Sequence, residues 1–127
     1  MLPRPPVVLV IEPSITLRTL LPIMLRQLSQ ARIFTFPDAL VALHHLRDAD
    51  FPAPDVILLT KDLPRLPGSV AARLLKHRHP DARMVMVMED EGCLGRILAR
   101  LAGAEKIVLK PYTLQNVQRI IDGVEAE

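Results

Sequence analysis

Short apolar segments recur along the chain, and four of them contain no polar position. Such continuous runs are typical of strands that are buried on both faces, as in a parallel sheet. A fifth segment alternates apolar with polar residues, a pattern typical of an edge strand. The predicted strands are Val7–Ile11, Val56–Leu59, Met84–Met88 and Ile107–Leu109, with Ala31–Phe36 at the edge.

Helical patterns fill the segments between and after the predicted strands. In the first of them, apolar residues recur every three or four positions from Leu17 to Leu28, which predicts an amphipathic helix. Thr113 precedes the last of them and is a typical N-cap residue. The predicted helices are Ile15–Leu28, Asp38–Leu46, Ser69–His77, Leu94–Leu101 and Leu114–Val124.

Strands and helices therefore alternate five times along the chain. This order implies βαβ units, a parallel sheet and right-handed crossovers that place helices on both of its faces. A chain of 127 residues builds one hydrophobic core, so we expect a single doubly wound α/β domain of three layers over residues 1–127. In such sheets, ligands bind beyond the carboxyl ends of the strands.

Composition narrows the function classes. Half of the residues are hydrophobic, and the net charge of +2 is too small to indicate a polyanionic partner. With Phe34, Phe36, Phe51 and Tyr112 as its aromatic residues, the chain is poorly equipped to stack nucleic-acid bases, so we expect no nucleic-acid binding. The single cysteine, Cys93, excludes an internal disulfide and fits a reducing, cytoplasmic location. No apolar run reaches the roughly 18 residues of a membrane span.

The candidate chemistry lies at the carboxyl ends of the predicted strands. Acidic, hydroxyl and basic side chains stand there, at the edge where a doubly wound sheet binds its ligand. The residues at these strand ends are Glu12 and Pro13, Thr60 to Asp62, Met88 to Asp90, and Lys110 with Pro111.

Five short motifs occur in a fixed order on this series of strands and helices. They are Leu9–Arg18 (LVIEPSITLR), Asp55–Thr60 (DVILLT), Leu63-Pro64 followed by Gly68, Ala102–Ala104 (AGA) and Lys110–Tyr112 (KPY). Together they resemble the receiver domain of two-component response regulators over nearly the whole chain. The resemblance implies a flavodoxin-like sheet with strand order 2-1-3-4-5. It also implies a role in phosphorelay signalling and not an enzymatic one.

The family's phosphorylation chemistry does not carry over to this sequence. Family members accept a phosphoryl group from a histidine kinase onto an aspartate, with the help of a divalent cation. Here Thr60 occupies the phosphorylation position, and Glu12 and Pro13 occupy the positions of the family's acidic pair. Thr60 offers an un-ionised hydroxyl with no histidine or aspartate base motif beside it, whereas the transfer needs a carboxylate and a metal. Because Pro13 has no side-chain oxygen, we expect magnesium binding to be weak or lost, and no cofactor.

The residues that would sense a phosphoryl group are replaced as well. Met88 occupies the position of the serine or threonine that hydrogen-bonds the phosphoryl group, and it cannot donate such a bond. Ile107 occupies the position of the switching aromatic residue. Lys110 is retained. We therefore predict a degenerate pocket in a pseudo-receiver, which acts by contact with a sensor kinase, an output domain or another signalling protein.

Two alternatives remain open. In the first, Asp62, Glu89 and Asp90 form a displaced cation site, and the domain is still switchable; otherwise these are solvated loop acids, or Glu12 or Glu89 pairs with Lys110. The second alternative is an unrelated flavodoxin-like enzyme or nucleotide binder. That function would need a glycine-rich phosphate loop after the first strand, and no glycine stands there.

The last third of the chain carries a candidate interaction surface. The resemblance implies that the fourth helix, fifth strand and fifth helix form a face through which family members dimerise or dock. We expect a homodimer or a partner contact there. The charged and amide residues predicted for this face are Arg96, Arg100, Lys106, Gln115, Gln118, Arg119 and Asp122.

Overall fold

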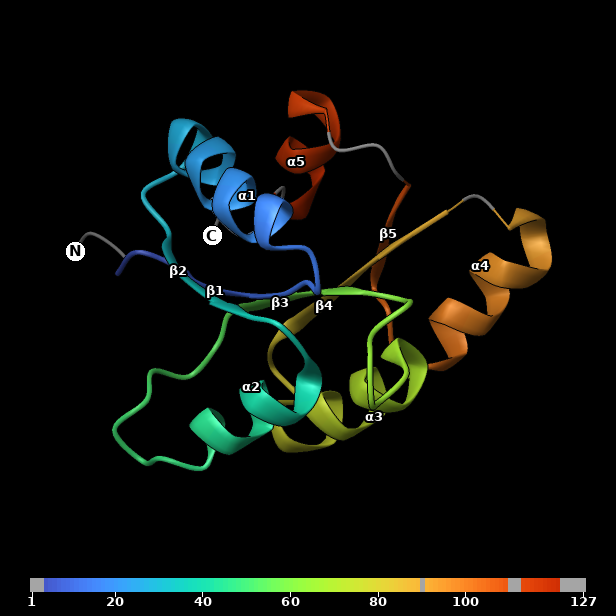
Figure 1. The fold of residues 1–127 in the computed structure, drawn as a ribbon, viewed down its shortest axis with the longest axis horizontal. Helices are drawn as coiled ribbons and strands as arrows, with labels where there is room; N and C mark the ends of the chain where they lie inside the picture. Colours follow the sequence, from blue (N-terminus) through green and yellow to red (C-terminus); the bar gives the residue numbers. More distant parts are fainter. Residues whose placement is uncertain (1–3, 90, 110–112, 122–127) are drawn as a thin grey trace.

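A five-stranded parallel sheet forms the centre of the molecule, with helices on both faces (Figure 1). The structure is a computed structural model, and it describes residues 4–89, 91–109 and 113–121. The strand order is β2-β1-β3-β4-β5, as predicted. The strands are β1 (Val7–Ile11), β2 (Arg32–Phe36), β3 (Val56–Thr60), β4 (Arg83–Met88) and β5 (Lys106–Leu109).

Burial along the strands explains their sequence patterns. All residues of β1 and β3 are buried, and so are the last five of β4, which is why these strands read as uninterrupted apolar runs. The edge strand β2 is half-buried, with its first residue, Arg32, exposed. All five predicted strands are confirmed, with ends that differ by a single residue.

The five predicted helices are also confirmed. Ser14 caps the first helix by accepting a hydrogen bond from the Leu17 N–H, and Asp38 caps the second by accepting one from the Val41 N–H. The prediction for the last helix extended to Val124, and its final three residues lie outside the described ones. The helices are α1 (Ile15–Leu28), α2 (Ala39–Leu46), α3 (Gly68–Arg78), α4 (Gly92–Leu101) and α5 (Leu114–Ile121).

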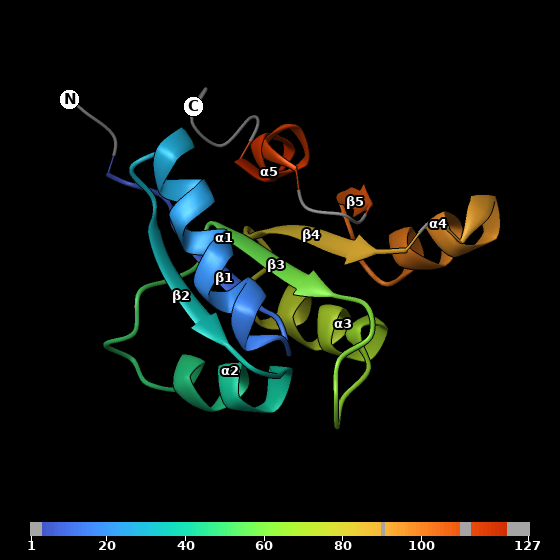
Figure 2. The same ribbon diagram turned by 45° about the horizontal axis from the view of Figure 1, so that its top comes forward.

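The sheet divides the core into two aliphatic layers. On one face, Val8 and Val10 of β1 pack in one cluster with Leu21 of α1 and Ile120 of α5. On the other face, side chains of α2, α3 and α4 pack on the sheet. Figure 2 shows α2 beside β2 at one end of the molecule and α4 near β4 and β5 at the other.

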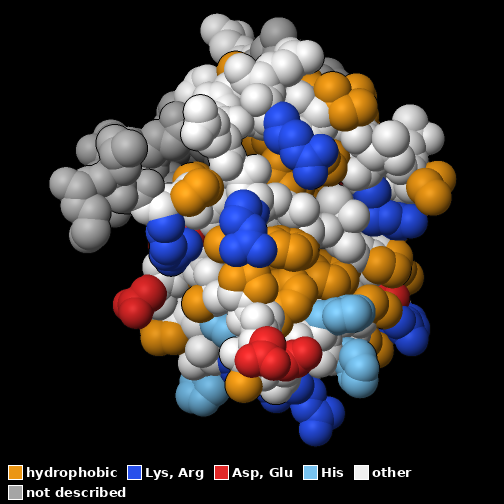
Figure 3. Space-filling view, turned by 90° about the vertical axis from the view of Figure 1, so that its left-hand side faces the viewer, with side chains coloured by type: hydrophobic (Ala, Val, Ile, Leu, Met, Phe, Trp, Pro, Cys, Tyr) orange, Lys and Arg blue, Asp and Glu red, His pale blue; other side chains and the backbone are white. Residues whose placement is uncertain are grey.

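Aromatic side chains gather at the β2 edge. The rings of Phe34 and Phe51 lie 4.9 Å apart, and that of Phe36 lies 5.3 Å from the ring of His45. The Arg32 guanidinium lies 5.6 Å from the Phe34 ring centre. Figure 3 shows this side of the molecule, with hydrophobic side chains at its centre and histidines below. The contacts cover an edge strand that would otherwise expose its apolar side chains.

None of the helices in the described ranges is long and apolar enough to cross a lipid bilayer.

Candidate functional site

Glu12 and Thr60 meet at the carboxyl edge of the sheet. The strands β1 and β3 are neighbours, with Ile11 opposite Leu59. The next residues along the two chain segments, Glu12 and Thr60, therefore lie side by side. The Thr60 hydroxyl donates a hydrogen bond of 2.8 Å to Oε1 of Glu12. Glu12 is 2% exposed and Thr60 3% exposed, so the pair is closed off from solvent.

This contact supplies a base that the sequence analysis did not consider. The sequence shows no histidine or aspartate base motif beside Thr60, and in the structure the carboxylate of Glu12 accepts a hydrogen bond from the Thr60 hydroxyl. A hydroxyl and a base in contact are the parts of an activated nucleophile. Here, however, both side chains are buried, which denies a phosphoryl donor access to the hydroxyl.

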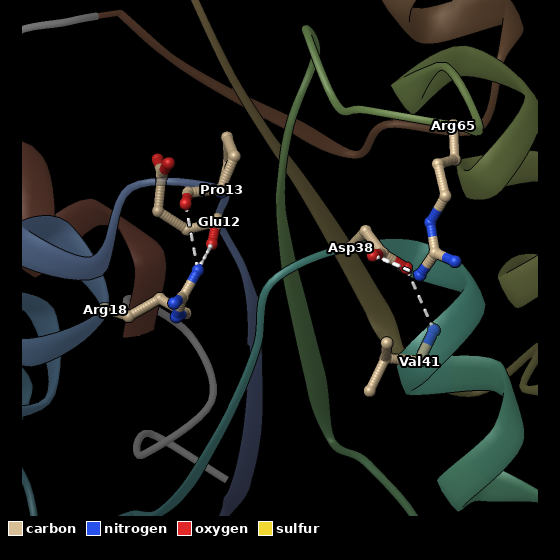
Figure 4. A network of polar contacts seen from close by, with 6 residues as sticks. All are labelled: Glu12, Pro13, Arg18, Asp38, Val41 and Arg65. Carbon is tan, nitrogen blue, oxygen red and sulfur yellow. Dashed lines mark hydrogen bonds and ion pairs between the residues drawn. The ribbon is translucent and has the colours of Figure 1, made fainter.

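The turn after β1 holds the Glu12 carboxylate in place. Its second oxygen, Oε2, accepts a hydrogen bond of 2.8 Å from the backbone N–H of Ser14. The Arg18 guanidinium donates to the backbone carbonyls of Glu12 and Pro13, each at 2.9 Å. Figure 4 shows the carboxylate pointing away from this arginine, so Arg18 fixes the backbone of the turn and does not neutralise the acid. The sequence motif contained Arg18 but gave no sign of this role.

Apolar or oxygen-free side chains occupy the other positions of the degenerate pocket. Pro13 is exposed and offers no side-chain ligand. Met88 is 1% exposed, and its methyl group lies 3.3 Å from the place where a Cβ on Gly95 would stand. Met88 therefore fills space against α4. Ile107 is buried in the core on the side of α2, α3 and α4.

The predicted displaced cation site has two acids among the described residues. Asp62 and Glu89 are exposed. Lys110 and Asp90 lie outside the described residues, so the predicted pairing of Lys110 with an acid stays a prediction. Within the described ranges, no three acidic, histidine or cysteine side chains converge in a way that could hold a metal ion.

Two ion pairs that the sequence analysis missed connect the loop between β3 and α3 to its neighbours. On one side, Nζ of Lys61 lies 2.5 Å from the Glu91 carboxylate, which joins this loop to the start of α4. On the other side, Nη2 of Arg65 lies 2.5 Å from Oδ2 of Asp38, the N-cap of α2 (Figure 4). Arg65 adopts a left-handed backbone conformation with φ of 65°. The paired residues lie 27 and 30 positions apart in the sequence, so no short-range spacing predicts these ion pairs.

Asp38 is the acid whose titration this arrangement alters. Burial alone would raise its pKa, but the Val41 N–H bond and the Arg65 guanidinium outweigh that effect and hold the pKa below its usual value of 3.8. The ionised form is therefore the one that caps α2 and binds the loop.

A glycine sets the path of the same loop. A Cβ on Gly68 would stand 2.6 Å from the Lys61 carbonyl oxygen and 2.7 Å from that of Thr60. The Gly68 N–H donates a hydrogen bond of 2.9 Å to the Lys61 carbonyl, so the loop closes directly over the end of β3. This close backbone approach explains the glycine at the family's motif position.

The predicted interaction face is made of exposed side chains with local contacts. Arg96, Gln115 and Arg119 are exposed. Arg100 is exposed and donates to the Glu105 carbonyl at 3.0 Å. Lys106 is half-buried and donates to the Arg119 carbonyl at 2.7 Å, which ties β5 to α5. Asp122 lies outside the described residues. The dimer stays a prediction.

Comparison with known proteins identifies the class. The family model of the response regulator receiver domain matches residues 8–122, and the chain belongs to that family. It is a receiver domain of a two-component response regulator, a signalling module of the kind that interacts with kinases and output domains. No curated protein sequence matches the chain.

Solved structures share this fold at low sequence identity. The chemotaxis response regulator CheY4 of Vibrio cholerae is 18% identical with a TM-score of 0.83, over 95% of this chain and 99% of that one. The receiver domain of NtrX from Brucella abortus is 23% identical with a TM-score of 0.80, over 94% and 98%. The response regulator DrrB of Thermotoga maritima is 21% identical with a TM-score of 0.81; the match covers 97% of this chain and 54% of DrrB.

Proposed function

We propose that this domain is an atypical receiver that signals without aspartyl phosphorylation and acts through protein–protein contact. The observation that carries the proposal is the buried hydrogen bond between Thr60 and Glu12 at the phosphoacceptor position. The side chain at the acceptor position is a hydroxyl, and its proton is already committed to a carboxylate.

The chemistry of acyl phosphate formation supports this proposal. A carboxylate nucleophile attacks the phosphorus of a phosphohistidine, and a divalent cation neutralises the charge that develops. Thr60 supplies no carboxylate, and Pro13 supplies no oxygen ligand. Magnesium requires several hard oxygen ligands in near-octahedral geometry, and both carboxylate oxygens of Glu12 are already hydrogen-bonded within the protein.

The residues that would respond to a bound phosphoryl group are replaced, as well as the residue that would accept it. A ligand shifts an equilibrium only through different contacts with the two states. Met88 and Ile107 are buried apolar side chains at the positions that would make those contacts. The domain therefore holds one conformation, and its partner-binding face is competent at all times.

The proposal is tested by exposing the domain to acetyl phosphate and Mg²⁺ and measuring the intact mass. We expect no phosphoryl adduct on the wild type or on Thr60→Asp, because Pro13 still lacks a ligand in that variant. A family receiver with an aspartate acceptor, treated in the same way, shows that the donor is active. A metal-dependent adduct on Thr60→Asp would contradict the proposal, since it would mean that the rest of the phosphorylation site is intact.

The homodimer is part of the same proposal. It would form through α4, β5 and α5, whose exposed cations include Arg100 and Arg119. Light scattering over a range of concentrations tests it: we expect the mass to rise toward that of a dimer, and a constant monomer mass would contradict it.

A further inference from the structure

Exposed apolar side chains gather on α3 and α4. The described part of the chain has ten large hydrophobic residues that are exposed, and six of them lie on these two helices. The most exposed of them are Leu94 and Leu101, at 68% and 67%. Val70, Leu98 and Leu101 line one groove, and an exposed apolar surface of this kind marks a site of interaction. The six residues are Val70, Leu74, Leu94, Ile97, Leu98 and Leu101.

The two flanks of α4 differ in character. Its buried residues Gly95 and Ala99 face the sheet, since they belong to the same side of the helix one turn apart. Arg100 lies on the flank toward β5, where it reaches the Glu105 carbonyl. Leu98 and Leu101 lie on the opposite flank, toward α3. Leu98 and Leu101 therefore lie on the flank of α4 opposite the one that meets the segment before β5.

A groove of about 370 Å³ runs between α3 and α4. Val70 of α3 lines one wall, and Leu98 and Leu101 of α4 line the other. Gly95 and Ala99 are also among its lining residues, and their small side chains keep the space between the helices open. An apolar groove between two helices fits the apolar face of a third helix.

The charged residues that line the groove are both basic. Lys61 stands at one end and pairs with Glu91. Arg73 projects from α3, is exposed, and has no ion-pair partner among the residues that the structure describes. A helix seated here would bury its apolar face beside an uncompensated positive charge. Charge complementarity therefore favours an occupant with acidic residues along one edge.

We propose that the groove between α3 and α4 is a docking site for an amphipathic helix of another protein. That helix would carry leucine-like residues at i, i+3, i+4 and i+7 and acidic residues on the edge that meets Arg73. The proposal deepens the function proposed above and rests on it for the idea that the domain acts by protein contact. The phosphorylation experiment tests that function separately and does not depend on the groove.

Two synthetic peptides of about four helical turns test the proposal directly. Both carry the same leucine spacing; one has glutamate at its edge positions and the other has lysine. Each is titrated into the ¹⁵N-labelled full chain, and amide shifts are followed. We expect the glutamate peptide to shift the resonances of Val70, Arg73, Leu98 and Leu101 and to bind more weakly as salt is added. We expect the lysine peptide to bind at least about threefold more weakly.

Variants with matched controls separate the contribution of the Arg73 charge from that of the apolar contact at Leu98. Arg73→Glu should weaken the glutamate peptide about three- to tenfold and strengthen the lysine peptide, because an exposed attraction becomes a repulsion. The same charge change at Arg78, which is exposed on the same helix but does not line the groove, should have no such effect. Leu98→Ser should weaken both peptides about tenfold or more. Leu40→Ser, at an exposed leucine of α2, is its control.

Four results would overturn the proposal. Neither peptide binds, or both bind equally and Arg73→Glu changes nothing, or the shifted resonances belong to β5 and α5 instead. The fourth is self-association of the unliganded chain that Leu98→Ser abolishes and Arg100→Glu does not, which would assign the groove to a second copy. Leu98 and Arg73 are exposed, so the variants should fold, and the dispersion of their amide spectra shows whether they do.

Discussion

Two regions of the molecule differ in which side chains they bury. They are the carboxyl ends of β1 and β3, and the groove between α3 and α4. At the strand ends, the polar groups are buried and hydrogen-bonded: Thr60 to Glu12, and Glu12 to the Ser14 N–H. In the groove, leucine side chains stand exposed. Burying polar groups with partners costs little, whereas leaving apolar surface in water costs free energy that a partner can recover. The contrast is what the two proposals rest on: a docking site in the groove, and a structural role for the buried Thr60–Glu12 pair.

Completeness of hydrogen bonding sharpens this difference. Among the described residues, no buried side-chain nitrogen or oxygen lacks a hydrogen-bond partner. Glu12 and Thr60 therefore belong to an interior in which every described buried polar side chain has a hydrogen-bond partner.

Apart from the core control Leu59→Ala, the largest effect is expected where the loop closes over β3. Gly68→Ala would place a methyl group against backbone atoms of Thr60 and Lys61, which cannot yield as a side chain would. We expect a loss of about 2–3 kcal/mol in the free energy of unfolding, measured by urea denaturation. Gly92→Ala is the control. It has positive φ but open space around its Cβ, so it should cost only about 1 kcal/mol. Equal losses would show that the close approach is not what matters.

The next effect tests the buried pair itself. Thr60→Val keeps the shape but removes the hydroxyl that donates to Oε1 of Glu12 in a buried site. We expect a loss of about 1–3 kcal/mol, by the same measurement. Thr60→Ser retains the donor and should lose less. A fully stable valine variant would mean that the hydrogen bond does not support the fold.

A smaller effect concerns the ion pair on the other side of the loop. Asp38→Asn keeps a capping side chain but loses the charge that Arg65 meets, and the pair is exposed at its arginine end. We expect a loss of about 0.5–1 kcal/mol at neutral pH. Because the folded pKa of Asp38 lies below 3.8, its stabilisation is complete above that value and is lost as the pH falls through the folded pKa.

Unfolding curves of the wild type and Asp38→Asn, measured at neutral pH and below pH 3.8, test whether the carboxylate charge stabilises the fold. The difference between wild type and variant should shrink in acid. A difference that stays the same, or grows, would show that the carboxylate charge is not the source of the stabilisation.

The smallest effect on stability is expected in the groove. Leu98→Ser should change the free energy of unfolding by no more than about 0.5 kcal/mol, since the side chain is 55% exposed. Leu59→Ala, a fully buried counterpart in β3, should cost about 2–5 kcal/mol. A large loss for Leu98→Ser would show that the groove belongs to the core, and the comparison would fail.

The fold could be predicted from the sequence because strands buried on both faces need apolar residues at every position. β1, β3 and β4 therefore have uninterrupted apolar runs. The sequence also placed Glu12 and Thr60 at one edge, because parallel strands end together. It could not predict the pairs Lys61–Glu91 and Asp38–Arg65, because these depend on how loops of separate crossovers meet.

The groove could not be predicted from the sequence for another reason. The leucine spacing of α4 is that of a buried helix face, yet Gly95 and Ala99 occupy the buried positions and the leucines are exposed. Periodicity finds an apolar stripe but does not say whether the protein's own sheet or a partner covers it.

The central claim is that the pocket no longer binds the ligands of a phosphorylated receiver. An amide NMR titration of the ¹⁵N-labelled domain with Mg²⁺, followed by beryllium fluoride as a phosphoryl mimic, tests it most directly. The account predicts that the resonances of Glu12, Thr60 and Lys110 do not move. Saturating shifts that begin at these residues and spread to Ile107 would contradict it, because they would reveal a working switch with unconventional ligands.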